Sequence, residues 1–466
     1  MERIETDYLV VGAGAVGMAF ADVLLAESDA DITIVDAHAK PGGHWNDAYP
    51  FVTLHQPSAF YGVSSRELGE SGFATEGLNA GLAHMATGRE VSDYFDAVMR
   101  ETFLPSGRVR YFPSHEYMGE GRIRSLETGA ETLVRARRHV DATWLKATVP
   151  SMHQPGFSIA RGMRFAPLNA LPELDPASDY VVIGGGKTGI DACLWLLENG
   201  TVPDAIRWIV PRDAWMIDRE NTQPDPSFFD RTIGAQAAQM EALAAADSVE
   251  DLFDRLERDG VLLRLDPAVR PRMFHGATIS RKELDLLRTL PNVVRMGRVE
   301  RIERDRIVLE RGAIPTGPDV MHVDCSASAI INLAVKPVFE GDTITPQCVR
   351  SYQPVFSAAF IAHVEATRNE EREKNELCTV VPLPNHDTDW LRMMVPFMMN
   401  QFRWSQDPEL RRWLIENRLD GFSATVRGAA KDDEEKQALI GRMRAAAMPA
   451  MANLHKLIAS LDRKEA

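Results

Sequence analysis

The 466-residue sequence is poor in features that would point directly to a disulfide-rich or metal-binding protein. It has only four cysteines, which are widely separated and include no C-x-x-C pair: Cys193, Cys325, Cys348 and Cys378. This spacing argues against a disulfide framework, a zinc site with the usual ligand spacing and a redox-active cysteine pair. The four thiols are therefore expected to be reduced and mostly structural.

Basic charge and long apolar runs are also scarce. The sequence has 52 Lys and Arg against 67 Asp and Glu, a formal net charge of −15, which argues against a general nucleic-acid binder. No apolar stretch approaches the length of a membrane span, and the first residues lack a signal-peptide layout, so a cytoplasmic location is expected. With 45% hydrophobic and 26% charged residues, the composition indicates a soluble protein of two or three domains.

A glycine-rich motif follows the first apolar run of the chain. That run leads into Gly12, Gly14 and Gly17, and the small and apolar residues behind them suit a helix. Strand, G-x-G-x-x-G turn and helix are typical of a dinucleotide-binding unit, in which the glycines permit the turn, the approach of a pyrophosphate and close helix packing. The next predicted strand, 32–35, ends at Asp36, a carboxylate suited to an adenosine ribose. FAD and NAD both carry that ribose, so this motif alone leaves the ligand open.

A second unit of the same layout begins at residue 180. The apolar run 180–183 leads into Gly184, Gly186 and Gly189, and a helix is expected behind them. The Gly-Lys-Thr within this turn is also part of a P-loop signature, but that motif needs a glycine where Val181 stands. The sequence therefore predicts a second dinucleotide site.

The charges around the second unit favour one nicotinamide nucleotide over the other. No acid follows its second strand; Arg212 stands there instead, and a guanidinium can pair with the 2′-phosphate of NADP. Lys187 adds a second cation in the turn, and Thr188 completes the set of candidate cofactor-binding residues. NADPH is therefore the expected nucleotide, with NADH less favoured, although solvated surface charge is the alternative reading of both cations.

Two such units in one chain predict an α/β protein in which hydride passes between two nucleotides. The expected architecture is an FAD-binding Rossmann domain over 1–150, an inserted NAD(P)H-binding Rossmann domain over 151–330, a return segment over 331–386 and a helical C-terminal region over 387–466. A helical excursion at 233–259 either shapes a substrate entrance or serves only as packing.

Residues 41–62 resemble the segment that follows the first Rossmann unit in flavin-containing monooxygenases and their Baeyer–Villiger relatives. In those proteins a Gly-Gly-x-Trp stretch lies near the flavin ring. The resemblance implies that role for Gly42, Gly43 and Trp45, and makes His44 the one catalytic candidate. Asn332 is a weaker candidate for a position near the flavin.

Resemblance to these class B flavin-dependent monooxygenases implies FAD and NADPH as cofactors. In the implied cycle, NADPH reduces FAD, the reduced flavin and O2 form a flavin hydroperoxide, and a small organic substrate is oxygenated. No metal is expected. The sequence departs from the linker fingerprint of the family, because Ala166 stands where a histidine is expected. This departure weighs against the Baeyer–Villiger branch. Two alternatives remain: an NAD(P)H-dependent flavin reductase or dehydrogenase without oxygen insertion, and a non-catalytic flavoprotein acting through a partner.

The C-terminal helices lie outside the resemblance. Their methionine-rich run, 393–399, is soft enough to line a pocket for an apolar substrate, but core packing or a subunit contact is the favoured reading. A homodimer through these helices is the assembly that the sequence suggests.

Overall fold

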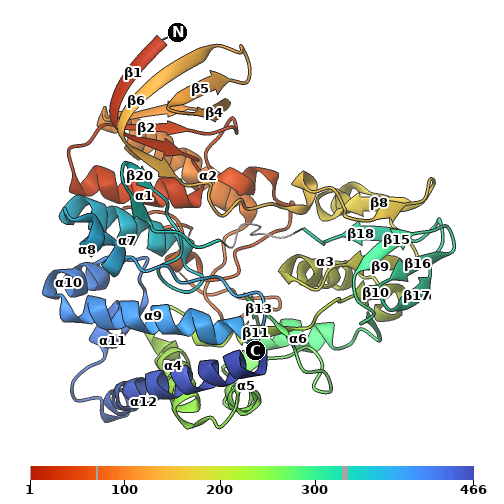
Figure 1. Ribbon diagram of the computed structural model, residues 1–466. Helices are drawn as coiled ribbons and strands as arrows, with labels where there is room; N and C mark the ends of the chain where they lie inside the picture. The colour runs from red at the N-terminus through yellow and green to blue at the C-terminus, as the bar shows by residue number, and fades with distance from the viewer. Residues whose placement is uncertain (1, 70–71, 328–333, 466) are drawn as a thin grey trace.

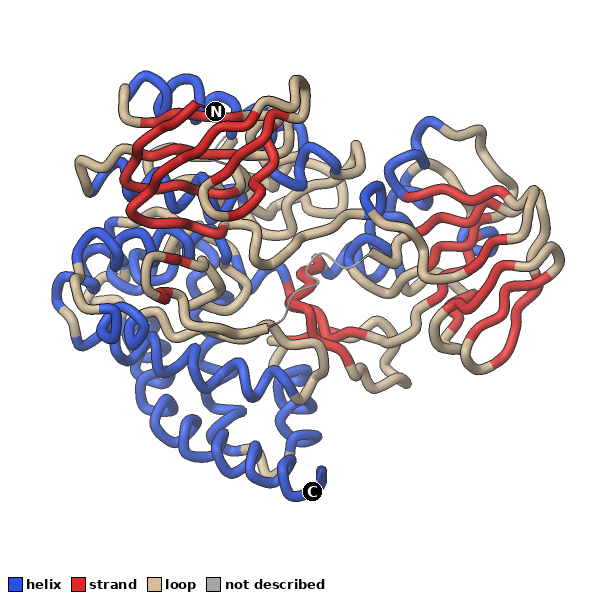
Figure 2. Tube along the Cα trace, turned by 45° about the horizontal axis from the view of Figure 1, so that its top comes forward, coloured by secondary structure: helices blue, strands red, loops and turns tan. Residues whose placement is uncertain are grey.

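The computed structural model describes residues 2–69, 72–327 and 334–465. Figure 1 shows two separate α/β units, one at the upper left above a layer of helices and the other at the right. Figure 2 shows the strands of the two units at opposite sides of the molecule, with a small central sheet between them. The expected α/β class with two Rossmann-like units is confirmed. Within the described residues, no helix is both long and apolar enough to cross a membrane.

The first unit is an eight-stranded sheet whose main path has the order β19-β20-β6-β1-β2-β3. Strand β1 pairs in parallel with both β2 and β6, so the glycine motif lies at the carboxyl end of the central strand. Strands β4 and β5 form an antiparallel meander on β6. The strands are β1 (Glu2–Val11), β2 (Ile32–Val35), β3 (Val109–Phe112), β4 (His115–Gly119), β5 (Arg122–Ser125), β6 (Glu131–Asp141), β19 (Phe339–Glu340) and β20 (Thr343–Ile344).

Strand β6 pairs with neighbours on both of its edges. It is one continuous strand over Glu131–Asp141, which closes the meander and also runs beside β1. A return strand can do both because its two edges are free to pair with different neighbours. Its end brings Thr143 against the first glycine turn, where a Cβ added to Gly12 would meet the Thr143 methyl at 3.0 Å.

Helices cover the first sheet and bury its core. Helix α1 packs against α7, and both are almost wholly apolar and buried. Helix α2 begins at a capping box in which the Thr87 hydroxyl accepts a hydrogen bond from the Glu90 backbone N–H. The helices of this unit are α1 (Ala15–Glu27), α2 (Gly88–Val98), α7 (Pro354–Thr367) and α8 (Glu371–Leu377).

The second unit is a five-stranded parallel sheet of order β14-β10-β9-β18-β8, with a four-stranded sheet beside it. Its buried core lies between this sheet and helices α3 and α6. Its elements are β7 (Ser158–Ile159), β8 (Arg164–Pro167), β9 (Tyr180–Ile183), α3 (Lys187–Glu198), β10 (Ile206–Ile209), α6 (Arg281–Leu287), β14 (Asn292–Val294), β15 (Val299–Ile302), β16 (Arg306–Leu309), β17 (Gly312–Pro315) and β18 (Met321–Asp324).

The segment between β10 and α6 forms a third structural group. Its strands make a separate three-stranded sheet of order β12-β11-β13, and its helices pack on the C-terminal helices to form one buried cluster. These elements are β11 (Ala214–Asp218), α4 (Phe229–Ala245), α5 (Val249–Arg258), β12 (Leu262–Leu263), β13 (Met273–Ile279), α9 (Asp389–Gln406), α10 (Pro408–Glu416), α11 (Phe422–Gly428) and α12 (Glu434–Glu465).

One expected loop in this segment is a strand. The glycine and proline content of 271–276 predicts a loop, but β13 already begins at Met273. The ladder with β11 shifts register between Trp215 and Ile217, opposite Gly276, which has φ +65°. Gly276 therefore marks a β-bulge within the strand. The domain boundaries and the homodimer remain predictions.

Candidate functional site

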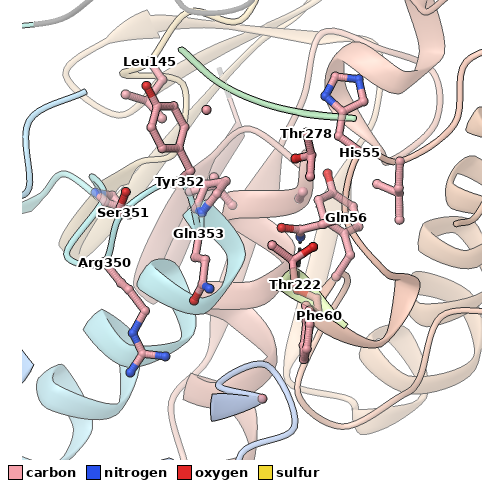
Figure 3. A pocket seen from close by; sticks show the side chains of 18 of the residues that line it. His55, Gln56, Phe60, Leu145, Thr222, Thr278, Arg350, Ser351, Tyr352 and Gln353 are labelled. Atoms are coloured by element: carbon pink, nitrogen blue, oxygen red, sulfur yellow. Dashed lines mark hydrogen bonds between the residues drawn. The ribbon is translucent and has the colours of Figure 1, made fainter. Parts of the chain in front are cut away.

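A cavity of about 1710 Å³ lies where the three structural groups meet. It is lined by Gly12 and Gly14 of the first glycine motif, by Thr188 of the second, and by the C-terminal helices. A pocket for one ligand usually measures about 300–1,000 Å³, so this space can hold more than one. Figure 3 shows one part of it, surrounded by side chains from distant segments of the chain: His55, Gln56, Phe60, Thr222, Thr278 and Arg350–Gln353.

The three glycines of the first motif have different structural roles. Gly12 has φ +103°, a conformation that L side chains rarely adopt. A Cβ on Gly17 would lie 1.9 Å from the Gly12 carbonyl oxygen, so α1 packs directly on the turn. By contrast, a Cβ on Gly14 would meet nothing closer than Gly43 Cα at 3.5 Å. The middle glycine thus borders open space at the uncapped N-terminus of α1, where a pyrophosphate fits.

Asp36 lies at the end of β2, as expected, and is nearly buried in the cavity wall. Its Oδ2 accepts a hydrogen bond from the Ala13 N–H at 2.6 Å, and its Oδ1 accepts one from the His38 backbone at 2.8 Å. The His38 ring bridges Asp36 and Asp47, with nitrogen–oxygen distances of 2.8 and 2.7 Å. These contacts, the one to Asp36 first, raise the pKa of His38 to about 9. The sequence reasoning missed this cation; a histidine two residues after the ribose acid was the available signal.

The Gly-Gly-x-Trp stretch folds back onto the first motif as a short 3-10 turn. Gly43 has φ +57°, and a Cβ there would lie 2.9 Å from Gly14 Cα, so the two loops touch. Trp45 donates its indole N–H to the Tyr61 hydroxyl at 2.8 Å. His44 lies on Trp45 with ring centroids 5.3 Å apart, and burial lowers its pKa to about 4. His44 therefore presents a neutral imidazole to the cavity at pH 7.

The second glycine motif repeats the geometry of the first. Gly184 has φ +133°, and a Cβ there would lie 2.4 Å from the Cys325 carbonyl oxygen. A Cβ on Gly189 would lie 2.1 Å from the Gly184 carbonyl oxygen, so α3 also packs directly on its turn. A Cβ on Gly186 would meet nothing within 4 Å. Space for a pyrophosphate is thus open at the uncapped N-terminus of α3, and Thr188 reaches the shared cavity.

Lys187 has a different environment from the one predicted for a 2′-phosphate ligand. Its ammonium pairs with Asp191 one helical turn further along α3, and its side chain is only 11% exposed. Asp191 also accepts a hydrogen bond from the Tyr49 hydroxyl at 2.6 Å. Lys187 and Asp191 therefore connect the second unit to the Gly-Gly-x-Trp region of the first.

Arg212 follows β10, as the sequence predicts for a residue that selects the nucleotide. Its guanidinium donates to Asn385 Oδ1 at 2.9 Å, while burial and the nearby Arg298 lower its pKa. The adjacent acid, Asp213, is already paired with Arg295 at 2.9 Å. Within the described chain, Arg212 therefore has a neutral partner and a neighbouring like charge, an arrangement that a bound anion would stabilise.

A buried ion pair between the structural groups was not predicted from the sequence. Arg219 is 1% exposed and donates to Glu283 Oε2 at 2.7 Å and to the Thr278 carbonyl at 3.0 Å. Asn79, from the first unit, donates to Glu283 Oε1 at 3.0 Å. These side chains are far apart in the sequence, so no local pattern marks them. They stabilise the wall of the cavity next to Thr278.

The methionine-rich run, 393–399, contributes both to the buried core and to the cavity wall. Met393 and Met394 are buried in the cluster shared with α4 and α12, yet both also border the cavity. Phe397 and Met398 border it from the next turn of α9. The run is therefore core on one side and cavity wall on the other.

Neither a metal-binding cluster nor a reactive thiol is found among the described residues. No set of three His, Cys, Asp or Glu side chains there is arranged to hold a metal ion. All four cysteines are free and buried, and burial raises the pKa of each thiol, so none is a ready thiolate nucleophile. Asn332 lies outside the described residues.

Three comparisons relate the chain to known proteins. A family model described as an NAD(P)-binding Rossmann-like domain matches residues 10–60. Uncharacterized proteins of Mycobacterium tuberculosis and Mycobacterium bovis are 51% identical over 420 residues, covering 90% of this chain and 78% of theirs. Cyclohexanone-bound cyclohexanone monooxygenase has a TM-score of 0.50 at 14% identity, over 81% of this chain and 92% of that one. A flavin monooxygenase mutant from Stenotrophomonas maltophilia, at 15% identity, covers 81% and 100% with a TM-score of 0.45.

Proposed function

The chain belongs to the same family as these mycobacterial proteins and has a class B flavin monooxygenase-like fold; on that premise we propose that it is an FAD-dependent, NADPH-consuming oxidoreductase. One observation supports this most directly: both glycine motifs border a single cavity. Two dinucleotides bound by their pyrophosphates at α1 and α3 would extend their reactive rings into the same space. FAD, when bound, supplies hydride acceptance from the nicotinamide and the chemistry of oxygen activation.

The first motif fits the FAD part of this proposal. Gly14 leaves room for the pyrophosphate, and Asp36 keeps carboxylate lone pairs for the adenosine ribose beside the Ala13 and His38 donors. The protonated His38 partly cancels the charge of Asp36 and Asp47, so less negative charge opposes the phosphates. Gly43 holds the Gly-Gly-x-Trp turn against Gly14, so Trp45 and the neutral His44 border the space beyond the pyrophosphate.

The second motif fits NADPH. The open space at Gly186 and the N-terminus of α3 would receive the pyrophosphate, with the Thr188 side chain beside it. Arg212, which lies near Arg298 and whose neighbouring acid Asp213 is paired with Arg295, would bind the 2′-phosphate. Lys187 is assigned instead to the contact between the units, because Asp191 already neutralises it.

Within that class, we propose a monooxygenase that acts on a small organic substrate with O2. The support is the composition of the cavity wall beyond the two motifs, where Met394, Phe397 and Met398 exclude water. A site without water protects a reactive oxygenating group from decomposition by water before it meets the substrate. The chain's own contribution is binding, orientation and exclusion of water, with neutral His44 able to donate or accept one hydrogen bond.

Stopped-flow spectroscopy tests the proposal. The FAD-loaded protein is reduced anaerobically with NADPH and then mixed with oxygenated buffer. Bleaching of the flavin, followed by a transient spectrum unlike either oxidised or reduced flavin, is the expected result. Direct return to oxidised flavin with peroxide release would favour the reductase or dehydrogenase. Failure of NADPH to bleach bound flavin would favour a non-catalytic flavoprotein.

A further inference from the structure

We propose that the substrate is an amphiphile with an apolar body and a single anionic headgroup, and that the C-terminal helices hold it. This inference rests on the proposed function, since it names the substrate class for the same cavity. It depends on two features of the helical wall: its apolar lining and the sign of the charges at its edge.

The helical wall of the cavity is formed by α4, α9, α11 and α12. Half of the residues with which these helices line the cavity are large and apolar, with methionines on three of the four helices, so the wall can adapt to a flexible hydrocarbon. The large apolar lining residues of these helices are Met240, Trp390, Met393, Met394, Phe397, Met398, Phe402, Phe422, Val426 and Met443.

The charges on this wall are of one sign. None of the described lining residues on α4, α9, α10, α11 and α12 is an aspartate or glutamate. Three arginines border the cavity instead, Arg411 on α10, Arg427 on α11 and Arg444 on α12. All three are exposed, and none forms an ion pair with a described residue. In a chain of net charge −15, five helices that line a cavity with three arginines and no described acidic residue are a specific feature.

The one acid near this wall is already neutralised. Asp420 borders the cavity between α10 and α11, but it pairs with the buried guanidinium of Arg350, which lies 3.8 Å from the centroid of the Phe356 ring. Among the described lining residues of this wall, no free carboxylate therefore opposes an anionic ligand. An apolar wall edged by arginines complements a chain that ends in a carboxylate, because the chain leaves water while the headgroup stays partly solvated.

Arg427 and Arg444 are the proposed headgroup contacts. Val426 packs in the cluster that contains Ile440 near the start of α12, so α11, which carries Arg427, lies near the helix that carries Arg444. Two partly solvated charge contacts should favour an anion over its neutral ester by about tenfold. The apolar body should add about fourfold in affinity for each buried methylene.

The test is equilibrium binding to the FAD-loaded protein, measured by calorimetry below the micellar range of each probe. The probes are dodecanoate, octanoate, methyl dodecanoate and dodecyltrimethylammonium. Dodecanoate is expected to bind tightest, about tenfold more tightly than its methyl ester, and to weaken with added salt. Equal affinity for dodecanoate and methyl dodecanoate, or tighter binding of the cation, would overturn the proposal.

Matched variants locate the two parts of the site. Arg427→Gln/Arg444→Gln is expected to remove the preference for dodecanoate over its ester. Arg442→Gln should retain that preference, because Arg442 pairs with Glu241 at 2.7 Å and does not border the cavity. Met398→Gln should weaken dodecanoate binding about fourfold, the equivalent of one methylene, whereas Met399→Gln, outside the lining, should not. Retention of the preference in the double arginine variant would overturn the headgroup assignment.

Two further readouts separate this proposal from its alternatives. Binding uses the oxidised protein, so loss of dodecanoate binding with normal NADPH bleaching would refute only the substrate class. Cosedimentation with anionic phospholipid vesicles that needs both arginines, without binding of free dodecanoate, would show a membrane contact instead and overturn the cavity site.

Discussion

Removal of the Arg212 guanidinium should change the nucleotide preference of the protein. In the structure this group has one neutral hydrogen-bond partner, Asn385, and a neighbouring cation, Arg298, so no carboxylate of the described chain competes for it. A charge-assisted hydrogen bond contributes about 1.5–3 kcal/mol, which corresponds to about a 10- to 150-fold loss of affinity. NADH lacks the 2′-phosphate, so its binding should be nearly unchanged.

The assay is the initial rate of flavin reduction in Arg212→Ala as a function of NADPH and NADH concentration. The KM for NADPH should rise about 10- to 150-fold, while kcat stays close to that of the unmodified protein. Arg301→Ala is the matched control, because Arg301 is half-exposed in the neighbouring sheet and pairs with Glu303 at 2.7 Å. Equal effects of Arg212→Ala on NADPH and NADH would refute the assignment of Arg212 to the 2′-phosphate.

Three other predictions follow from the geometry. Gly14→Val should yield folded protein without FAD, whereas Gly17→Ala should fail to fold because its Cβ would lie 1.9 Å from a carbonyl oxygen. Circular dichroism reports folding and flavin absorbance reports bound FAD in the two variants. Full FAD occupancy in Gly14→Val would contradict the assignment of Gly14 to the FAD site. The His38 pKa is raised from 6.5 to about 9, so its contribution of at most about 3 kcal/mol is complete below pH 6.5 and is lost as pH rises through 9; urea unfolding of His38→Gln should lack that decline. Arg219→Met should lower the free energy of unfolding by about 3–5 kcal/mol because it leaves Glu283 buried without its cation, and Glu283→Leu in addition should restore much of it.

Local sequence patterns determined the two nucleotide units. The first and third glycines of each motif depend largely on the motif itself: Gly12 and Gly184 have positive φ, and Gly17 and Gly189 let the helix pack on the carbonyl of that first glycine. The structure therefore reproduces both turns at the expected residues. The strands next to them were also predictable, because buried parallel strands are continuous apolar runs. Where the pattern was weak, as at 271–276, the tertiary pairing with β11 decided the outcome.

Only the tertiary structure could decide which side chains meet. Lys187 and Arg212 read alike as cations after a glycine motif, but Asp191 neutralises one and Asn385 leaves the other available for an anion. Arg219 and Glu283 pair across an interface that no periodicity encodes. The C-terminal helices carried only an apolar pattern, and their role as a cavity wall depends on packing against α4, which is remote in the sequence. Patterns within one element determine that element, whereas contacts between elements depend on how the whole chain packs.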